Sequence, residues 1–188
     1  GGNPFDTTAI YGMINHLERR DGVWFPMGGT GALVDALHRL LEEAGVAVEL
    51  GRTVERITVE AGRATGVELD DGRHVPAEVV VSNMDPMRVY REMLPEGAPS
   101  PVARLRGRAA RLSMGLYVLY FGARRQWPEV AHHTVWFGDR YRALLSDIFH
   151  RRHLARDFSL YVHRPTATDP SFAPPGCDSF YVLCPVPN

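Results

Sequence analysis

Hydrophobic residues recur at helical spacing in two segments near the start of the 188-residue chain. The first pattern predicts a short helix over residues 9–19, and the second predicts a longer helix over residues 30–44. Gly45 follows directly, at the position where many helices end on a residue with positive φ. The apolar positions of the two helices are Ile10, Met13, Ile14 and Leu17, and Leu33, Leu37, Leu40, Leu41 and Ala44.

The hydrophobic spacing then changes to the period of β-strands. Residues 46–50 alternate as a strand, and the segments "VERITVE" and "ATGVELD" predict a hairpin around residues 61–63. Residues 71–72 form a second turn signal, and "AEVVVSN" at residues 77–83 is a continuous apolar run typical of a strand buried on both faces. This order predicts an α/β unit in which small antiparallel strands form a connection over a main parallel sheet.

Asp85-Pro86 interrupts this pattern, and we predict a domain crossing near this point. Residues 87–94 predict one or two helical turns. Beyond a proline-rich stretch, four segments rich in Val, Tyr, Phe and Leu predict an antiparallel sheet, with a polar helical stretch at residues 140–153. These strands are predicted at residues 112–121, 133–137, 158–163 and 179–186. The predicted fold class is α/β, with α+β character in the fragment as a whole.

The composition, with 45% hydrophobic and 23% charged residues, is that of an ordinary globular chain. A formal net charge of -1 with scattered arginines argues against a nucleic-acid partner, which requires a basic stripe. Cys177 and Cys184 have neither metal-knuckle spacing nor the density of a disulfide scaffold, so we expect a reducing, cytoplasmic compartment. The longest apolar stretch is shorter than the roughly 20 residues of a membrane helix, so any membrane contact is expected to be peripheral.

The glycine-rich segment at residues 28–31 resembles a phosphate-binding loop only in composition. A P-loop requires Lys followed by Ser or Thr after its last glycine, where Ala32 and Leu33 stand. The dinucleotide fingerprint requires a third glycine where Val34 stands. The segment is therefore predicted to be a glycine-rich turn that opens a helix without binding a phosphate.

The adjacent residues His132 and His133 raise the question of a metal or acid–base site. Neighbouring residues of a strand point to opposite faces, so the pair alone is not expected to chelate, and structural hydrogen bonding is the preferred interpretation. The signatures GxSxG and HExxH are absent from the sequence. We therefore predict no metal site and name no catalytic residue.

Six separated stretches of the sequence together resemble one known family. They are "GGNPF", "GVWFPMGGTGALV", "LYVLYFG", "AHHTVWFG", the "RYR" at residues 140–142, and "DFSLYVHRPTATDPSFAPPGCDSFYVLCPVPN". In content and order they resemble the bacterial-type phytoene desaturases, FAD-containing enzymes of carotenoid biosynthesis in the amine-oxidase-like flavoprotein superfamily. The resemblance runs along the whole chain but covers less than half of a typical member, so we expect an internal fragment.

The resemblance implies a domain organisation. Residues 1–21 would end a substrate-domain segment, and residues 22–86 would form the central part of a Rossmann-like FAD-binding domain with an antiparallel β connection. Residues 87–188 would form the sheet and helices of an antiparallel-sheet substrate-binding domain. The two glycine-rich flavin segments of family members are not in this sequence, so we expect the chain alone to be inactive and to bind FAD weakly or not at all.

The resemblance also implies contacts with FAD. The backbone of Val54 would contact the adenine side of the cofactor, although a plain strand residue is an equal alternative. Ser82 and Asn83 would approach the dinucleotide at the carboxyl end of the buried strand, where α/β sheets bind ligands. Asn83 could instead cap the short helix that follows.

The implied reaction is the desaturation of phytoene toward lycopene, for which flavin must be the hydride acceptor because no side chain can be. The protein would align the hydrocarbon in an apolar, aromatic tunnel and exclude water, and contact the membrane peripherally. Alternatives are a carotenoid isomerase, ketolase or oxygenase on the same scaffold, or a non-catalytic lipid-binding module. The tunnel candidates, each with plain core packing as the alternative, are Tyr117, Tyr120, Phe121, Trp136, Phe137, Tyr161, Phe180 and Tyr181.

Overall fold

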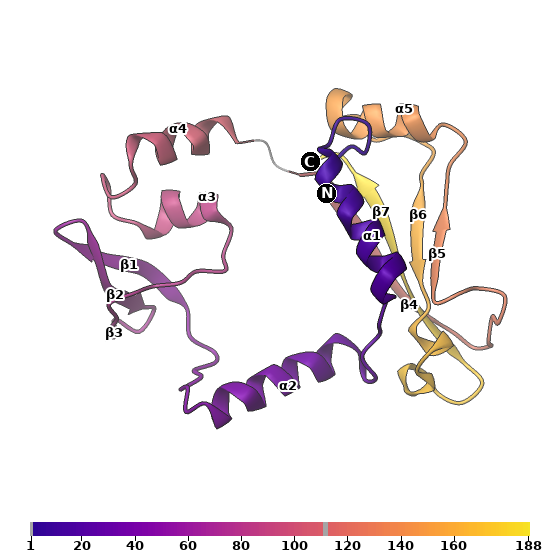
Figure 1. Ribbon diagram of the computed structural model, residues 1–188, viewed down its shortest axis with the longest axis horizontal. Helices are drawn as coiled ribbons and strands as arrows, with labels where there is room; N and C mark the ends of the chain where they lie inside the picture. The colour runs from indigo at the N-terminus through magenta and orange to yellow at the C-terminus, as the bar shows by residue number, and fades with distance from the viewer. Residues whose placement is uncertain (1, 111–112) are drawn as a thin grey trace. The chain divides into compact units, whose positions relative to one another are not determined.

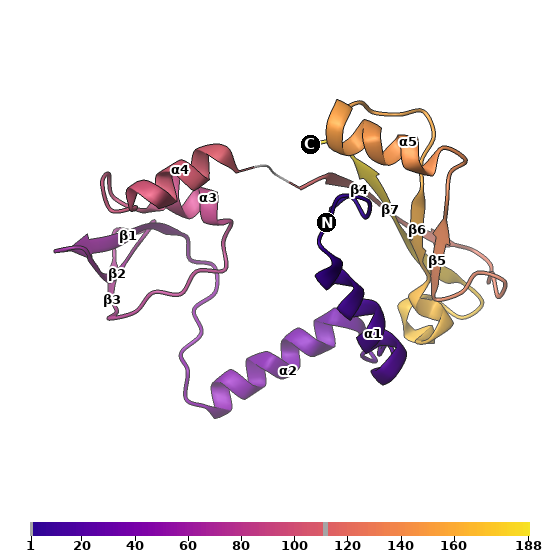
Figure 2. The same ribbon diagram turned by 45° about the horizontal axis from the view of Figure 1, so that its top comes forward.

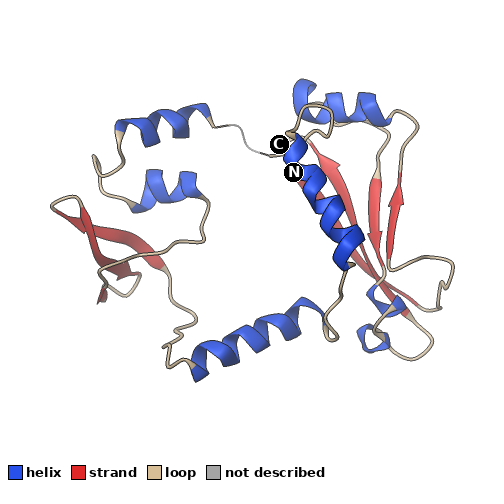
Figure 3. Ribbon diagram, in the orientation of Figure 1, coloured by secondary structure: helices blue, strands red, loops and turns tan. Residues whose placement is uncertain are grey.

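The computed structural model describes residues 2–110 and 113–188. The chain forms two compact units, one joining residues 1–44 with residues 112–188 and the other covering residues 45–111. The predicted α/β class is confirmed, because helices accompany antiparallel sheets in the described chain (Figures 1 and 3).

Two helices begin the first unit. The Thr8 side chain caps a 3-10 turn at Ala9–Tyr11, which continues into α1 (Gly12–Asp21). The second helix, α2 (Gly29–Glu43), starts after Gly28 and is followed by Gly45 with φ 74°. Both helices and the glycine at the end of α2 were predicted from the apolar spacing, and these predictions are confirmed.

The main sheet of the first unit has four antiparallel strands. They are β4 (Gly115–Ala123), β5 (His133–Trp136), β6 (Leu160–His163) and β7 (Asp178–Val186), in the order β4-β7-β6-β5. This confirms the predicted antiparallel sheet in the residues that the structure describes; residue 112 lies outside them. Figure 2 shows the four strands side by side.

A helical segment covers one end of this sheet, as Figures 1 and 2 show. It consists of α5 (Tyr141–Ser146) and a π-helical turn at Asp147–Arg151. Its apolar side supplies the buried core, where Leu144 and Ile148 pack with Ala155. Two 3-10 turns, Pro165–Ala167 and Pro170–Phe172, form the connection between β6 and β7.

Strand register sorts the side chains of the sheet onto two faces. Leu119 lies opposite Val182, and Tyr117 lies opposite Cys184, so these four share what we call the first face. The alternate residues of each strand point to the opposite side of the sheet, which we call the second face. Tyr120 and His163 both lie opposite Tyr181, and Tyr161 lies opposite Leu183.

The second unit contains a small sheet and short helices. The sheet order is β1-β2-β3, from β1 (Val54–Glu60), β2 (Arg63–Leu69) and β3 (His74–Pro76). The turn between β1 and β2 has positive φ at both Ala61 and Gly62, as a two-residue hairpin requires, so the predicted hairpin is confirmed. The helical elements that follow are α3 (Pro86–Arg88), a π-helical turn at Val89–Met93 and α4 (Pro101–Ala109).

Two predicted strands are wrong for this chain. Residues 46–50 and 77–83 are not strands, and Val79 and Val81 are 75% and 91% exposed. An apolar run becomes a buried strand only where neighbouring strands satisfy its backbone groups and layers cover both faces. Among the described residues, these two segments pair with no such neighbour.

The interpretation of Asn83 as a helix cap is also wrong. The carboxylate of Asp85 accepts hydrogen bonds from the backbone N–H groups of Met87 and Arg88, so Asp85 is the N-cap of α3. The Ser82 hydroxyl accepts from the Met84 N–H at 3.3 Å. The sequence "SNMDP" therefore places its capping side chain two residues later than we expected.

Gly66 in β2 is expected to tolerate no side chain. Its φ is +153°, and an added Cβ would lie 2.2 Å from the Val75 carbonyl oxygen of β3. We expect Gly66→Ala to destabilise the small sheet by at least about 2 kcal/mol, measured as faster hydrogen exchange of the β2 amides. Gly31→Ala is the control, because the space around Gly31 in α2 is open and alanine favours helix. Unchanged β2 exchange in Gly66→Ala would contradict this account.

Candidate functional site

The first face of the four-stranded sheet carries an apolar cavity of about 650 Å³. Side chains from β4, β6 and β7 form its floor, and the segment after the π-helical turn forms its wall. Arg152 is the single charged residue in the lining. Such a volume is in the range of small-molecule sites. The lining residues are Tyr117, Leu119, Arg152, Leu154, Phe158, Leu160, Val182, Cys184, Val186 and Pro187.

The sheet divides the eight tunnel candidates between its two faces. By register, Tyr117, Phe121, Trp136 and Phe180 lie on the first face, and Tyr120, Tyr161 and Tyr181 lie on the second face. Phe137 follows β5 and contacts the ring of Tyr141 at 5.0 Å between centroids. Tyr117 alone of the eight lines the cavity, so the tunnel role of the set stays a prediction.

Sequence reasoning missed the aliphatic half of the cavity. Leu119 and Val182 lie directly opposite each other on the first face, and the buried Cys184 lies one pair further along. Selecting aromatic residues left out Leu119, although strand alternation places it on the same face as Tyr117. Burial raises the pKa of the Cys184 thiol, so this cysteine is a neutral, apolar part of the lining.

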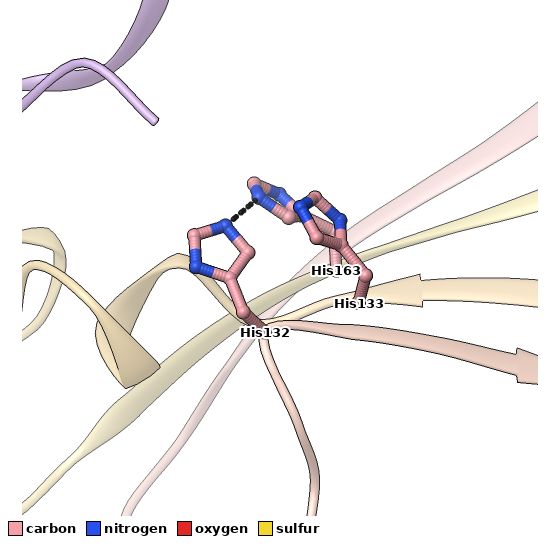
Figure 4. Close-up of side chains that lie close together, drawn as sticks. All are labelled: His132, His133 and His163. Carbon is pink, nitrogen blue, oxygen red and sulfur yellow. Dashed lines mark hydrogen bonds between the residues drawn. The ribbon is translucent and has the colours of Figure 1, made fainter. Parts of the chain in front are cut away.

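Three histidines meet at the other end of the sheet, as Figure 4 shows: His132 immediately before β5, His133 at its first position and His163 at the last position of β6. The Nε2 atoms of His132 and His163 are 2.7 Å apart and share a hydrogen bond. One nitrogen from each ring lies within 4.8 Å of the others. We call these residues the histidine cluster.

This geometry corrects the interpretation of His132 and His133 as residues that point apart. Their ring centroids are 4.4 Å apart. Alternation applies only within a strand, and β5 begins at His133, so the backbone before it can turn the His132 ring toward its neighbour. Sequence reasoning also missed His163, whose position at the end of a predicted strand in "LYVHRP" was the available signal.

Burial favours the neutral form of two rings of the histidine cluster. Burial, together with the nearby rings of His132 and His133, lowers the pKa of His163 to about 4. Burial also lowers the pKa of His132. Tyr161, which hydrogen bonds to Nδ1 of His133, has its pKa raised to about 12 by burial and by Tyr181.

The glycine-rich segment packs against the connection between β6 and β7. The Gly28 N–H donates to the Asp169 carboxylate at 2.7 Å, and hydrogen bonds from Ser171 and Gly28 lower the pKa of Asp169. Gly29 has φ 74°, and an added Cβ would lie 2.7 Å from the Phe172 ring. The geometry of this segment agrees with a close-packed turn that opens α2.

The residues expected to contact FAD lie in the second unit. Val54 is the first residue of β1, which is an edge strand among the described residues, so the outward backbone groups of this strand can bind a ligand. Ser82 and Asn83 are exposed on a segment without regular secondary structure. The backbone of β1 and these polar side chains thus fit cofactor contacts, while their roles stay predictions.

The arrangement of helices and antiparallel sheets has a counterpart among solved structures. A crystal structure of an oxidoreductase from Methanosarcina mazei matches with a TM-score of 0.68 and 22% identity, over 95% of this chain and 38% of that one. This likeness shows a common fold. The chain belongs to the flavin containing amine oxidoreductase family, whose model matches residues 1–181.

Curated relatives are more similar in sequence. The lycopene-forming phytoene desaturases of Pseudescherichia vulneris and a Paracoccus species are 48% and 49% identical to the chain, over its whole length. The neurosporene-forming phytoene desaturase of Rhodobacter capsulatus is 43% identical. The chain spans 38% of the length of the first two relatives. The predicted family and its flavin cofactor are confirmed.

Proposed function

We propose that the whole protein is an FAD-dependent phytoene desaturase that acts toward lycopene. Two relatives at 48% and 49% identity are described as lycopene-forming phytoene desaturases. The observation that carries the proposal is the apolar cavity on the first face, because phytoene is a hydrocarbon without a polar handle. A cavity with one charged residue suits such a substrate better than a polar metabolite.

The residues of this chain would bind and orient the reactants. Leu119, Val182 and Phe158 would hold a segment of the hydrocarbon and exclude water from it. The backbone of Val54, with Ser82 and Asn83, would hold FAD, which supplies the hydride acceptor when bound.

A peripheral position on the cytoplasmic side of the membrane belongs to the same proposal. A substrate that resides in lipid must reach the cavity from a lipid surface, and exposed apolar side chains favour such contact. Leu116 and Tyr120 on β4 are large exposed residues of this kind. In the part of the chain that the structure describes, none of the helices has the length and apolar character of a membrane span.

The proposal is tested by assaying the full-length protein and this chain side by side. Phytoene in liposomes is incubated with each protein and added FAD, and the products are separated by chromatography. We expect the full-length protein to form conjugated products and the chain alone to form none, because the family's glycine-rich flavin segments are not in this sequence. A full-length protein that binds flavin but leaves phytoene unchanged would contradict the proposed function.

A further inference from the structure

We propose that the histidine cluster, His132, His133 and His163, binds one zinc ion. The three imidazoles come from the adjacent ends of β5 and β6, and one nitrogen of each lies within 4.8 Å of the others. Three histidine ligands with one open position form a well-known zinc arrangement. The proposal is independent of the desaturase reaction.

The distance between His132 and His163 requires only a small adjustment of these two rings. The Nε2 atoms of His132 and His163 are 2.7 Å apart and share a proton in a hydrogen bond. Two nitrogens on a tetrahedral zinc ion, each about 2.05 Å from it, are separated by about 3.3 Å. Zinc would therefore fit between the two nitrogens when the rings move apart by about 0.6 Å, the difference between these separations, and the shared proton would move to Nδ1 of His163.

Partners outside the cluster already orient two of the rings. Nδ1 of His132 is hydrogen bonded to the Thr168 hydroxyl, and Nδ1 of His133 is hydrogen bonded to the Tyr161 hydroxyl. Each hydroxyl can accept the ring proton at Nδ1, which leaves Nε2 unprotonated, the form that binds a metal. Such outer partners are the rule around zinc-bound histidines.

The third ring carries a nitrogen that lacks a partner. His163 is 8% exposed, and its Nδ1 atom is buried without a hydrogen-bond partner among the described residues. Because Nε2 of His163 is the nitrogen that faces His132, the ring would bind zinc through Nε2 and carry its proton on Nδ1. His133 is exposed, which gives an ion a path into the cluster.

The surrounding charges do not prevent binding of a cation. Arg164, whose positive charge contributes to the lowered pKa of His132, is paired with the buried Asp178 carboxylate at 3.0 Å. Imidazole nitrogens favour zinc over calcium or magnesium, which prefer oxygen ligands. A bound ion would tie β5 to β6 and fix the His132 ring, against which Phe25 packs with its centroid 4.7 Å away.

The test is a calorimetric titration of the metal-stripped full-length protein with ZnCl₂, supported by the absorption spectrum with Co²⁺. We expect one zinc ion per chain. His133→Ala, a substitution at the exposed ligand that should leave the fold intact, is expected to weaken zinc binding more than about 100-fold, and Tyr161→Phe about 10-fold. His16→Ala removes an exposed histidine of α1 and should leave the affinity unchanged.

Three results would overturn the proposal. The first is the absence of stoichiometric zinc binding, and the second is equal affinity in His133→Ala and the unsubstituted protein. The third is a thiolate-to-cobalt charge-transfer band, which would place the metal on a cysteine instead. Comparing the zinc affinities of His133→Ala and His16→Ala distinguishes binding at the histidine cluster from nonspecific binding of zinc to exposed histidines. Circular dichroism verifies that each variant is folded.

Discussion

Replacing Asp178 with alanine is expected to lower the free energy of unfolding by about 3 to 5 kcal/mol. Asp178 is 1% exposed and accepts hydrogen bonds from the Trp127 N–H, the Arg164 guanidinium and the Thr166 hydroxyl, at 2.7, 3.0 and 2.6 Å. Its removal leaves the buried Arg164 charge without its partner and two further donors unsatisfied. Urea denaturation, followed by circular dichroism, measures the loss.

Asp139→Ala is the matched control, because Asp139 is exposed on a turn of the same unit and its substitution should change stability by less than about 0.5 kcal/mol.

The pH dependence of the stability gives a second test of the role of Asp178. Burial favours a higher pKa for Asp178, but its three hydrogen bonds outweigh this effect and lower the pKa below the ordinary 3.8. The carboxylate therefore stabilises the fold above pH 3.8. The difference in stability between the unsubstituted protein and Asp178→Ala should shrink as the pH falls further. Equal stability of Asp178→Ala and the unsubstituted protein at neutral pH would contradict this role of Asp178.

Local elements could be predicted because their signals are local. The hairpin requires positive φ at residues 61 and 62, and Ala61-Gly62 lies between two alternating segments, so the turn and both strands followed from the sequence. The same holds for α2 and Gly45, where apolar spacing and a terminal glycine agree.

Elements that depend on distant partners could not be predicted in this way. Residues 77–83 have the composition of a buried strand, but the described chain supplies no neighbouring strand, so Val81 is exposed. The histidine cluster depends on the register between β5 and β6, which places His133 opposite His163 across 30 residues of sequence. Spacing along the chain does not contain that information, because strand pairing is set by the packing of the whole sheet.

The cavity also depends on how the strands pair. Tyr117 was predicted as a substrate contact because it is aromatic, whereas Leu119 and Val182 acquire their positions from the pairing of β4 with β7. Alternation along one strand gives two faces, but only the register and the segment around Leu154 decide which face encloses a cavity. The structure therefore identifies the cavity residues of the first face, whereas the sequence alone shows them only as apolar residues of predicted strands.

Blocking this cavity is expected to slow desaturation by the full-length protein at least about 100-fold, because a displaced substrate is no longer aligned with the cofactor. Leu119→Trp puts the larger side chain into the cavity from the edge strand β4, where the sheet can tolerate it. Val118→Trp makes a comparable change one residue earlier on the second face. We expect this control to keep its rate within about threefold, since surface substitutions away from a site have small effects.

Phytoene conversion is measured by product chromatography, and flavin absorbance is measured on the same samples. If Leu119→Trp retains flavin but no longer converts phytoene, the defect lies in substrate binding, because FAD contacts are expected at Val54, in the other unit. Equal rates in the two tryptophan variants would show that the first-face cavity does not bind the hydrocarbon. A larger loss in Val118→Trp would instead move the substrate to the second face, where Tyr120, Tyr161 and Tyr181 lie. The pair of variants thus distinguishes between the two faces, which no single substitution on β4 can do.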